Sequence, residues 1–508
     1  MSANANLYAR FAATFTPSRT LLELPDGSRV SYAEAERESA RAANALHALG
    51  LAPGDRVSVI AEKSPRYLWL YLGCLRAGLV FHPLNTGYTE RELAFFIGDA
   101  GARLVVSDPA LAERVGKACA AAGCAPRQLA MDAAGEGSFA AACTTAADAF
   151  ATVVRTDGDD AALLYSSGTT GTPKGIRITH GNLYANACAL REAWHFTADD
   201  ILVHALPVFH VHGLFITLGP ALLAGATLRF LPRFDPQAVV AALPGATLMA
   251  GVPTYYTRLL AAPGFGRAQC ATMRLFISGS APLSEATFHE FHARTGHVIL
   301  ERYGMTETGI NTSNPLHGER KPASVGPALP GVEVRVVDGA GRTCASGDIG
   351  AIQVRGPNVF PGYWQLPEAT ARAFDADGWF DTGDQGHLDD AGYLFIVGRS
   401  KDMVISGGLN VYPKEIEREL ETLDGIAEAA VFGVPHADFG EAVVAAVVAT
   451  ADFDEQRTIA ALRTRLAAFK VPKRVLALGE LPRNTMGKVQ KNLLRERYAG
   501  LLDADADD

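Results

Sequence analysis

Short apolar segments alternate with amphipathic segments along most of this chain, and this alternation constrains the fold more than any other feature. Residues 56–62 are typical of a strand, and residues 64–78 are typical of a helix with Ser64 as its N-cap and Gly78 as its stop. The same rhythm starts again near Ile201. Strands that alternate with helices form parallel sheets covered by helices, so we expect an α/β fold.

The pattern changes further along the chain. Over residues 323–398, short strands separated by glycine-rich turns predict a small β subdomain. Beyond it, the pattern predicts three strands and two helices, at 413–420 and 458–469. We therefore expect a large N-terminal domain over 1–400, made of two helix-covered, mainly parallel sheets plus the β subdomain, and a smaller mobile α+β domain over 401–508.

Composition and charge argue against several classes of protein. The 508 residues carry a formal net charge of −9, which argues against a general nucleic-acid binder. The seven cysteines are scattered and lack a C-x-x-C spacing, which indicates reduced thiols rather than disulfides or a zinc site. The chain shows no basic-then-apolar leader, and no apolar run approaches the ~18–20 residues that cross a bilayer. We expect a cytoplasmic protein with no membrane or nucleic-acid partner.

A glycine-rich loop at residues 165–175 follows an apolar strand. Its glycines let backbone N–H groups approach an anion, and its hydroxyls and ammonium add donors for phosphate oxygens. The Gly-Lys-Ser/Thr of a Walker A loop is absent. By composition alone, an ordinary solvated loop is the favoured interpretation. The candidate phosphate-binding residues are Ser166, Ser167, Gly168, Thr169, Thr170, Gly171 and Lys174.

The complete eleven-residue string is more specific than its composition. It resembles the phosphate loop of the adenylate-forming superfamily, which includes acyl-CoA synthetases, luciferases and peptide-synthetase adenylation domains. Five further segments resemble motifs of that family in the same order, so the resemblance spans almost the whole chain. These segments are Gly279–Pro282, with Ser280 in place of a commoner glycine, Tyr303–Glu307, Trp379–Asp384, Gly398–Asp402 and Pro482–Val489.

The resemblance implies that a carboxylate attacks the α-phosphorus of ATP, with Mg²⁺ and coenzyme A as the other reactants. The carboxylate and ATP are both anions, so such a site must neutralise charge and align them. Without the motifs, the simpler interpretations would be a surface residue for Glu307, a core residue for Tyr303 and a turn residue for Asp384. The implied roles are adenine binding for Gly279, Ser280, Ala281 and Tyr303, phosphate binding for Thr169 and Thr306, Mg²⁺ binding for Glu307, and ribose binding for Asp384 and Arg399.

Two lysines carry roles that the resemblance alone implies. Lys488 resembles the lysine that contacts the α-phosphate and the attacking oxygen, and by type alone it is one solvated lysine among many. Lys401 resembles the hinge about which the C-terminal domain rotates, bringing Gly407 and Gly408 toward coenzyme A. The resemblance also implies that acetylation of Lys488 removes its charge, with a protein acetyltransferase and deacetylase as partners.

The segment around Lys488 is strongly basic. From Arg463 to Arg497 we count ten Lys or Arg and two Glu, so the segment carries +8 in an acidic protein. Such a field suits the phosphates of ATP and coenzyme A. A solvated basic face is the simpler alternative, and a nucleic-acid patch is disfavoured because few aromatic residues are interleaved.

Two arginines stand where the acyl pocket is expected. Arg258 lies in an otherwise apolar segment and Arg302 directly precedes Tyr303. A buried guanidinium without a carboxylate partner is costly, so either a diacid substrate or an acid of the protein, such as Glu301, supplies the partner. These motifs resemble most the malonyl-CoA synthetases, in which residues matching Arg258, Ser280 and Arg302 hold the distal carboxylate and one matching His210 lines the pocket.

Other functions stay open at this point. The resemblance also fits a ligase for another short acid, or an adenylation enzyme that loads a carrier protein in trans. A luciferase-like oxidase and a non-catalytic nucleotide-binding protein are the further alternatives, and retention of Glu307 and Lys488 argues against the last. The remaining histidines, including His289 and His292 on one helix face, lack a third ligand and make a weak case for zinc.

Overall fold

The computed structural model describes residues 4–166, 173–406, 409–436, 439–449, 453–484 and 487–502. It divides the chain into two units. The first comprises Met1–Glu333 and Val354–Phe380, and the second comprises Val334–Gln353 and Asp381–Asp508. The domain boundary expected at residue 401 lies inside the second unit, and it stays a prediction about which part of the chain moves.

A six-stranded sheet forms the first half of the first unit. Its strand order is β6-β5-β3-β4-β7-β8, parallel except for the antiparallel pair β7 and β8. The strands are β3 (Arg56–Ile60), β4 (Val80–Pro83), β5 (Leu104–Ser107), β6 (Arg127–Ala130), β7 (Asp160–Ser166) and β8 (Lys174–Thr179). The helices here are α2 (Tyr32–Ala48), α3 (Pro65–Ala77), α4 (Glu90–Ala100), η1 (Pro109–Leu111), α5 (Ala112–Ala121) and α6 (Ser138–Thr144).

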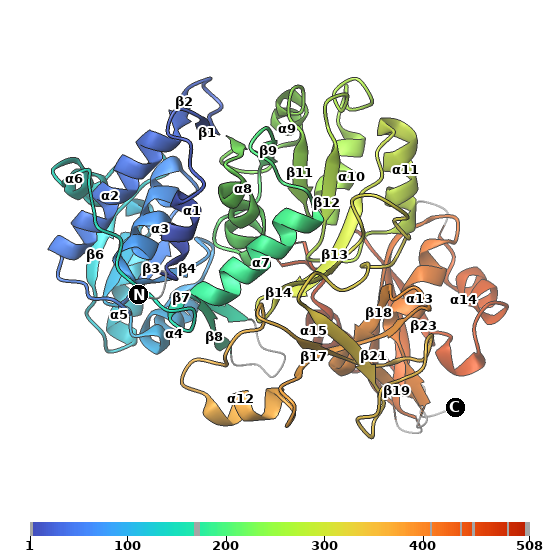
Figure 1. The fold of residues 1–508 in the computed structure, drawn as a ribbon. Helices are drawn as coiled ribbons and strands as arrows, with labels where there is room; N and C mark the ends of the chain where they lie inside the picture. Colours follow the sequence, from blue (N-terminus) through green and yellow to red (C-terminus); the bar gives the residue numbers. More distant parts are fainter. Residues whose placement is uncertain are drawn as a thin grey trace. The chain divides into compact units, whose positions relative to one another are not determined.

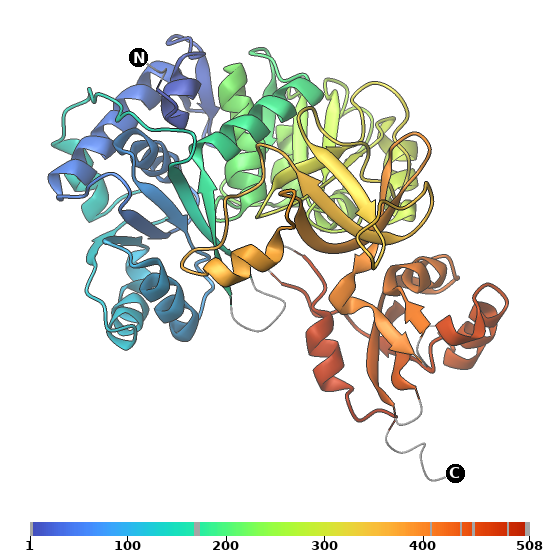
Figure 2. The same cartoon turned by 60° about the horizontal axis from the view of Figure 1, so that its bottom comes forward.

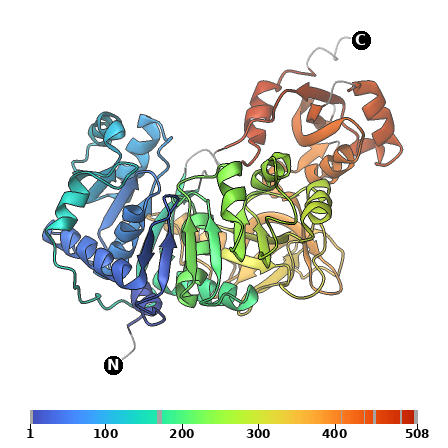
Figure 3. The ribbon, with the colours of Figure 1, turned by 90° about the horizontal axis from the view of Figure 1, so that it is seen from above.

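An eight-stranded sheet forms the second half of this unit. Its order is β14-β13-β12-β11-β9-β10-β1-β2, and only the edge strands β2 and β14 run antiparallel to their neighbours. Figure 3 shows the dark-blue strands β1 and β2, from the start of the chain, beside the green strands near residue 230. The strands are β1 (Thr20–Glu23), β2 (Arg29–Ser31), β9 (Ile201–His204), β10 (Thr227–Phe230), β11 (Leu248–Gly251), β12 (Leu275–Ser278), β13 (Leu300–Met305) and β14 (Gly309–Ser313).

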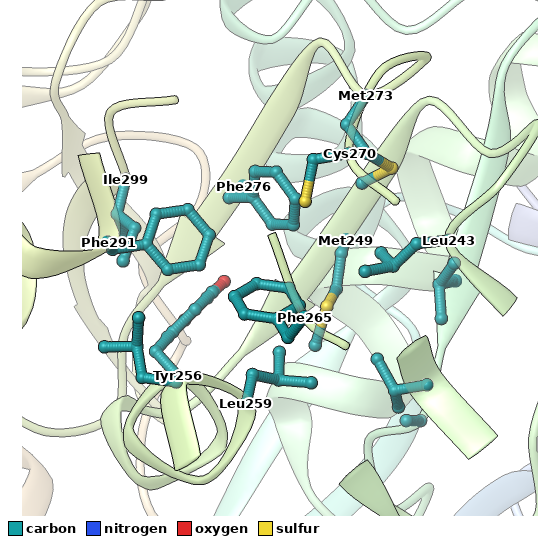
Figure 4. Close-up of a cluster of buried hydrophobic side chains, with 14 of the residues drawn as sticks. Leu243, Met249, Tyr256, Leu259, Phe265, Cys270, Met273, Phe276, Phe291 and Ile299 are labelled. Atoms are coloured by element: carbon teal, nitrogen blue, oxygen red, sulfur yellow. The ribbon is translucent and has the colours of Figure 1, made fainter. Parts of the chain in front are cut away.

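Helices flank the eight-stranded sheet, and α9, α10 and α11 lie beside β11 and β12 (Figure 1). Side chains from these helices and strands make one apolar cluster in which the Phe291 ring contacts both Tyr256 and Phe276 (Figure 4). The Tyr256 hydroxyl donates to the carbonyl of Ile277 at 2.5 Å, which ties α10 to β12. The helices are α1 (Leu7–Ala12), α7 (His180–Ala193), the π-helix η2 (His212–Thr217), α8 (Leu218–Ala224), α9 (Pro236–Ala242), α10 (Pro253–Ala261) and α11 (Glu285–Thr295).

A four-stranded sheet lies in the part of the chain that was predicted to be β-rich. Its four strands pair in the order β15-β16-β17-β18, and a single short helix, α12 (Pro367–Ala373), interrupts them among the described residues. The strands are β15 (Glu333–Val337), β16 (Gly350–Arg355), β17 (Phe380–Leu388) and β18 (Leu394–Arg399), followed by the short helix η3 (Ser400–Asp402).

The end of the chain has a fourth sheet with helices at its outside, drawn in orange to red in Figure 2. It contains β19 (Val404–Ser406), β20 (Leu409–Val411), β21 (Ile426–His436), β22 (Gly440–Ala449) and β23 (Arg474–Leu478), with α13 (Pro413–Glu421), α14 (Glu455–Arg463), η4 (Ala468–Lys470) and α15 (Lys491–Arg497). The helix predicted at 458–469 is wrong in its bounds. The Asp454 side chain caps the helix early by accepting from the Arg457 N–H, and the chain leaves helical geometry after Arg463.

The expected fold class is confirmed: two helix-covered, mainly parallel sheets, a β subdomain and an α+β C-terminal part. The helix predicted at 64–78 is also confirmed, with the Ser64 hydroxyl accepting from Tyr67 N–H and Gly78 at a φ of 70°. No helix in the described part of the chain has both the length and the hydropathy needed to cross a bilayer.

Candidate active site

The candidate site residues of the first unit gather where parallel strands of the eight-stranded sheet end. His204 ends β9, Gly251 ends β11 and Ser278 ends β12, while Arg302 and Tyr303 lie on the neighbouring strand β13. Because parallel strands share one carboxyl edge, the loops that follow them meet there, and ligands of α/β sheets bind at that edge.

A tight hairpin positions Thr306 and Glu307. They lie in the turn between the antiparallel strands β13 and β14, where the Thr308 N–H donates to the Met305 carbonyl at 3.1 Å. Gly309 closes the turn with a φ of 60°, a conformation that favours glycine. This geometry places the Tyr303–Glu307 motif at the tip of a hairpin.

Glu307 and Lys174 both contact Tyr363. The Glu307 carboxylate is 6% exposed, and the Tyr363 hydroxyl donates to its Oε1 at 3.4 Å. The Lys174 Nζ lies 4.8 Å from the centre of the Tyr363 ring. Burial, and then the charge of Glu307, raise the pKa of Tyr363, so it stays a neutral donor. Tyr363 belongs to none of the recognised motifs, so no sequence signal pointed to it.

Glu307 fits the magnesium role by its chemistry. Carboxylate oxygens are hard ligands, and Mg²⁺ in nucleotide sites is held by one or two carboxylates together with substrate phosphates and water. The described residues contain no cluster of three acidic, histidine or cysteine side chains that could hold a metal. Magnesium bound at Glu307 would therefore take its remaining ligands from the nucleotide and water.

The turn Gly279–Ala281 directly follows β12. Gly279 packs directly against the guanidinium of Arg302, so a side chain at position 279 would force Arg302 to shift. Ser280 has a φ of 72°, a left-handed conformation that costs a non-glycine residue about 1 kcal/mol or more. The neighbouring Tyr303 ring is 8% exposed. The structure thus brings the predicted adenine-binding turn and Tyr303 to adjacent strands.

Arg302 is a buried cation that needs a partner. It is 6% exposed, and its Nε and Nη2 have no hydrogen-bond partner among the described residues. Burial lowers its pKa to about 10, so it remains charged at neutral pH. Adjacent residues of a strand face opposite sides, which directs Glu301 away from Arg302. Two unpartnered N–H groups of one guanidinium form a fork suited to a carboxylate.

Two histidines lie beside this arginine. The His212 Nδ1 lies 3.2 Å from the Ser280 hydroxyl, and its buried Nε2 has no partner among the described residues. Burial and then Arg302 lower the pKa of His210 to about 4 and that of His212 well below its ordinary value, so both rings are neutral at pH 7. Sequence reasoning named His210 and missed His212.

Arg258 makes no hydrogen bond or ion pair with this cluster among the residues that the structure describes. It is exposed on α10, whereas Tyr256 and Leu259 of the same helix face the core. Its neighbour Tyr255 stacks on Phe234 with ring centres 3.7 Å apart. The structure therefore supports Arg302, Ser280 and His210 as one group and leaves the role of Arg258 a prediction.

The backbone strain at Ser280 yields a test. Ser280→Gly removes a side chain from a left-handed position and should stabilise the folded protein by about 0.5–1 kcal/mol. The same change removes a hydroxyl from the substrate pocket, so kcat/KM for a substrate held there should fall about tenfold. Thermal unfolding and steady-state kinetics measure the two effects. A variant that loses stability would contradict the interpretation of Ser280 as strained for function.

The second unit holds the predicted ribose-binding pair. Asp384 is 3% exposed, and the Arg399 Nε lies 2.9 Å from its Oδ1 across the antiparallel strands β17 and β18. The strand segment before Asp384 is held by the Thr382 hydroxyl, which donates to the Ile352 carbonyl at 2.8 Å. A buried, oriented carboxylate of this kind can accept hydrogen bonds from sugar hydroxyls.

Lys488 lies in a tight turn of the same unit. Its N–H donates to the Asn484 side chain at 3.0 Å, and Gly487 has a φ of 75°. The lysine retains exposed surface, while partial burial of its ammonium, and then repulsion from Arg399, lower its pKa to about 8. Burial also lowers the pKa of Lys401, the predicted hinge.

Most of the basic segment from Arg463 to Arg497 is neutralised. Six of its ten cations form ion pairs with acids of neighbouring elements, so its +8 is largely cancelled locally. The pairs are Arg465–Glu419, Lys470–Glu415, Arg474–Glu455, Arg483–Glu428, Lys491–Glu417 and Arg495–Asp402. Lys488 is not in these pairs, and the structure thus favours a local rather than a segment-wide role for positive charge.

Part of the predicted site lies outside the described residues. β7 ends at Ser166, whose side chain is not described, and β8 begins at Lys174, so the phosphate loop connects two antiparallel strands. The predicted residues outside the described ranges are Ser167, Gly168, Thr169, Thr170, Gly171, Gly407 and Gly408.

Comparison with known families gives two matches along the chain. A family model described as AMP-binding enzyme matches residues 9–364, and one described as AMP-binding enzyme C-terminal domain matches residues 415–488. The first match alone covers more than half of the chain. Together they cover both the candidate site of the first unit and the Lys488 turn.

Individual relatives differ in the acids named for them. The chain is 39% identical to a feruloyl-CoA synthase from Amycolatopsis sp, covering 93% of this chain and 94% of that protein. It is 35% identical to a malonate–CoA ligase from Arabidopsis thaliana, covering 88% and 78%. The crystal structure of ATP-bound MatB from Rhodopseudomonas palustris is similar at 50% identity and a TM-score of 0.96, covering 98% and 100%.

Proposed function

The chain belongs to the AMP-binding enzymes, the adenylate-forming acyl-CoA synthetase superfamily, and from that premise we propose that it is a malonate–CoA ligase. The coarser function, an AMP-forming acid–thiol ligase, follows from family membership. The choice of malonate rests on one observation: the buried Arg302 guanidinium has two N–H groups without partners among the described residues. The far carboxylate of a short diacid would supply the missing acceptor.

The proposed reaction has two steps. A malonate oxygen attacks the α-phosphorus of ATP, the bond to the β-phosphate oxygen breaks, and pyrophosphate leaves. The thiol of coenzyme A then attacks the acyl carbon of malonyl-AMP and loses its proton to solvent, AMP leaves with the electron pair of the broken bond, and malonyl-CoA forms. Each step needs negative charge to be offset where it develops.

The residues divide this work by their chemistry. Arg302 and Ser280 would hold the far carboxylate, with His210 lining the pocket. Glu307 would bind Mg²⁺ on the phosphates, and Asp384 with Arg399 would hold the ribose. In this proposal Lys488 acts on the α-phosphate in the first step, and acetylation by a protein acetyltransferase, reversed by a deacetylase, would switch that step off. The proposal includes a cytoplasmic location, consistent with free cysteines in the structure.

Other acids are the main alternative, because relatives of similar identity are named for ferulate and indoleacetate. An uncharged aromatic end would leave the Arg302 donors buried without an acceptor, at a cost of about 1–3 kcal/mol each. Methylmalonate is compatible as a second substrate, since one added methyl changes binding by only ~1–3 kcal/mol. Loading a carrier protein in place of coenzyme A remains the nearest alternative for the second step.

A substrate panel tests the proposal. Pyrophosphate release with ATP, Mg²⁺ and coenzyme A should be fastest with malonate, slower with methylmalonate, and weak with acetate, propionate, ferulate, indoleacetate and octanoate. Removal of Mg²⁺ by a chelator should stop all turnover. Higher kcat/KM with ferulate or octanoate than with malonate would refute the malonate assignment while leaving the ligase function intact.

A further inference from the structure

The π-helix η2 begins with His212, which lies beside Ser280 of the candidate active site. Such helices are rare and concentrate at functional sites. The His212 ring is 1% exposed, and its Nδ1 lies 3.2 Å from the Ser280 hydroxyl. His212 is therefore the side chain in direct contact with a residue that the proposed function assigns to the substrate.

A buried lysine anchors the neighbouring strand. Lys63 is 5% exposed, and its Nζ lies 2.7 Å from the His204 Nδ1, 2.7 Å from the His204 carbonyl and 3.2 Å from the Leu206 carbonyl. It also lies 4.3 Å from the centre of the Phe230 ring. Burial lowers the pKa of Lys63, but these acceptors and the ring face favour the ammonium form.

The partners of His204 assign its ring proton. Its Nε2 lies 2.8 Å from the Gly213 carbonyl, which can only accept, so Nε2 carries the proton. Burial and the charge of Lys63 keep the ring neutral by lowering its pKa, so Nδ1 has a free lone pair and accepts from Lys63. Three acceptors around Nζ then use all three N–H groups of an ammonium, whereas a neutral amine has two.

This network holds the backbone that carries His212. Gly213 receives hydrogen bonds from His204 and, at 2.9 Å, from the Thr217 hydroxyl, which also lies 3.1 Å from the His212 carbonyl. A Cβ on Gly213 would lie 2.0 Å from the Pro207 carbonyl oxygen, so the chain is closely packed there. The His212 ring consequently has little freedom to leave Ser280.

We propose that His212 is a positioning residue for substrate choice: it donates from Nδ1 to the Ser280 hydroxyl and so directs the hydroxyl proton toward the far carboxylate of a dicarboxylate. A carboxylate only accepts hydrogen bonds, so Ser280 must donate to it and must receive its own hydrogen bond from His212. Lys63 and His204 hold this arrangement from behind. The inference deepens the proposed function and rests on it.

Two substitutions at position 212 separate hydrogen bonding from packing. In His212→Asn the amide nitrogen occupies the place of Nδ1 and keeps the donor, while His212→Leu fills the space without one. We expect His212→Leu to raise KM for malonate about tenfold, the effect of one hydrogen bond to a charged group, and to leave kcat/KM for propionate and KM for ATP nearly unchanged. His212→Asn should restore most of the malonate affinity.

Lys63→Met provides a second, remote test. It removes the ammonium that orders His204, and the malonate-to-propionate ratio of kcat/KM should fall about threefold to tenfold, with thermal unfolding recorded to confirm folding. Three results would overturn the inference. They are an equal loss of kcat/KM on malonate and propionate, a His212→Asn variant as poor on malonate as His212→Leu, and an unchanged malonate-to-propionate ratio in His212→Leu and Lys63→Met. A wild-type enzyme that shows no preference for malonate would instead refute the proposed function.

Discussion

Replacing Arg302 by methionine is expected to lower kcat/KM for malonate roughly 30-fold to 5,000-fold. This corresponds to about 2–5 kcal/mol of lost transition-state stabilisation, the usual cost of removing one partner of a buried charged pair. Methionine has a similar length, so the pocket stays filled. The KM for ATP should change little, because Arg302 is assigned to the acid and not to the nucleotide. Initial rates with malonate, propionate and varied ATP measure the effect.

The stability of the same variant provides an independent measurement with the opposite sign. In the free protein, Arg302 is a buried charge with unpartnered donors, so its replacement by an apolar side chain should leave Tm unchanged or raise it. Arg320→Met is the matched control, since Arg320 donates to the carbonyls of Val298, Pro315 and Leu316. It should lower Tm and keep the malonate-to-propionate ratio. Equal loss with every acid and with ATP in Arg302→Met would make Arg302 structural.

The fold class was predictable because it depends on local patterns. Alternating strands and helices, the N-cap at Ser64 and the glycine stop at Gly78 are all encoded within short windows of sequence. The motif residues were named from the family resemblance, and the structure places Ser280 just after β12 and Arg302 and Tyr303 on the neighbouring strand β13.

Residues that act through tertiary contacts were not predictable. Tyr363 reaches Glu307 from 56 residues away, and Lys63 reaches His204 across 141 positions, so no sequence window contains either pair. From the sequence alone, Lys63 would be interpreted as an ordinary surface lysine and His212 as a core histidine. Their roles depend on burial, and burial is set by the packing of distant elements.

Charge counting failed for a related reason. A count of cations between Arg463 and Arg497 does not include the acids on α13, α14 and other elements. In the structure these acids form ion pairs with six of the cations. The exposure of Arg258 was also not predictable, because an apolar sequence context does not specify which face of α10 a residue occupies, and its role stays a prediction. The sequence therefore predicts which residues could take part in catalysis better than it predicts which residues they contact in the fold.

Lys488→Ala is expected to slow adenylation by about 10²–10³-fold, the usual cost of removing one group that stabilises developing charge. Thioester formation from supplied malonyl-AMP should change far less, because that step has no attack on the α-phosphate. Pyrophosphate release and single-turnover thioester formation measure the halves separately. Lys473→Ala is the control, because it removes one positive charge from the same basic segment. The Lys473 Nζ lies 4.8 Å from the Phe439 ring centre, and its loss should leave adenylation nearly intact.

The pH dependence of adenylation tests the same lysine without removing it. Burial and Arg399 lower the pKa of Lys488 to about 8, so its ammonium is present below that pH and is lost above it. Adenylation should therefore fall as pH rises through about 8 in the wild type, whereas Lys488→Arg, which stays charged, should show residual activity without that descending limb. If the wild type and Lys488→Arg show the same descending limb, the titrating group is not Lys488. If Lys488→Ala damages both half-reactions equally, the charge stabilisation belongs to another group.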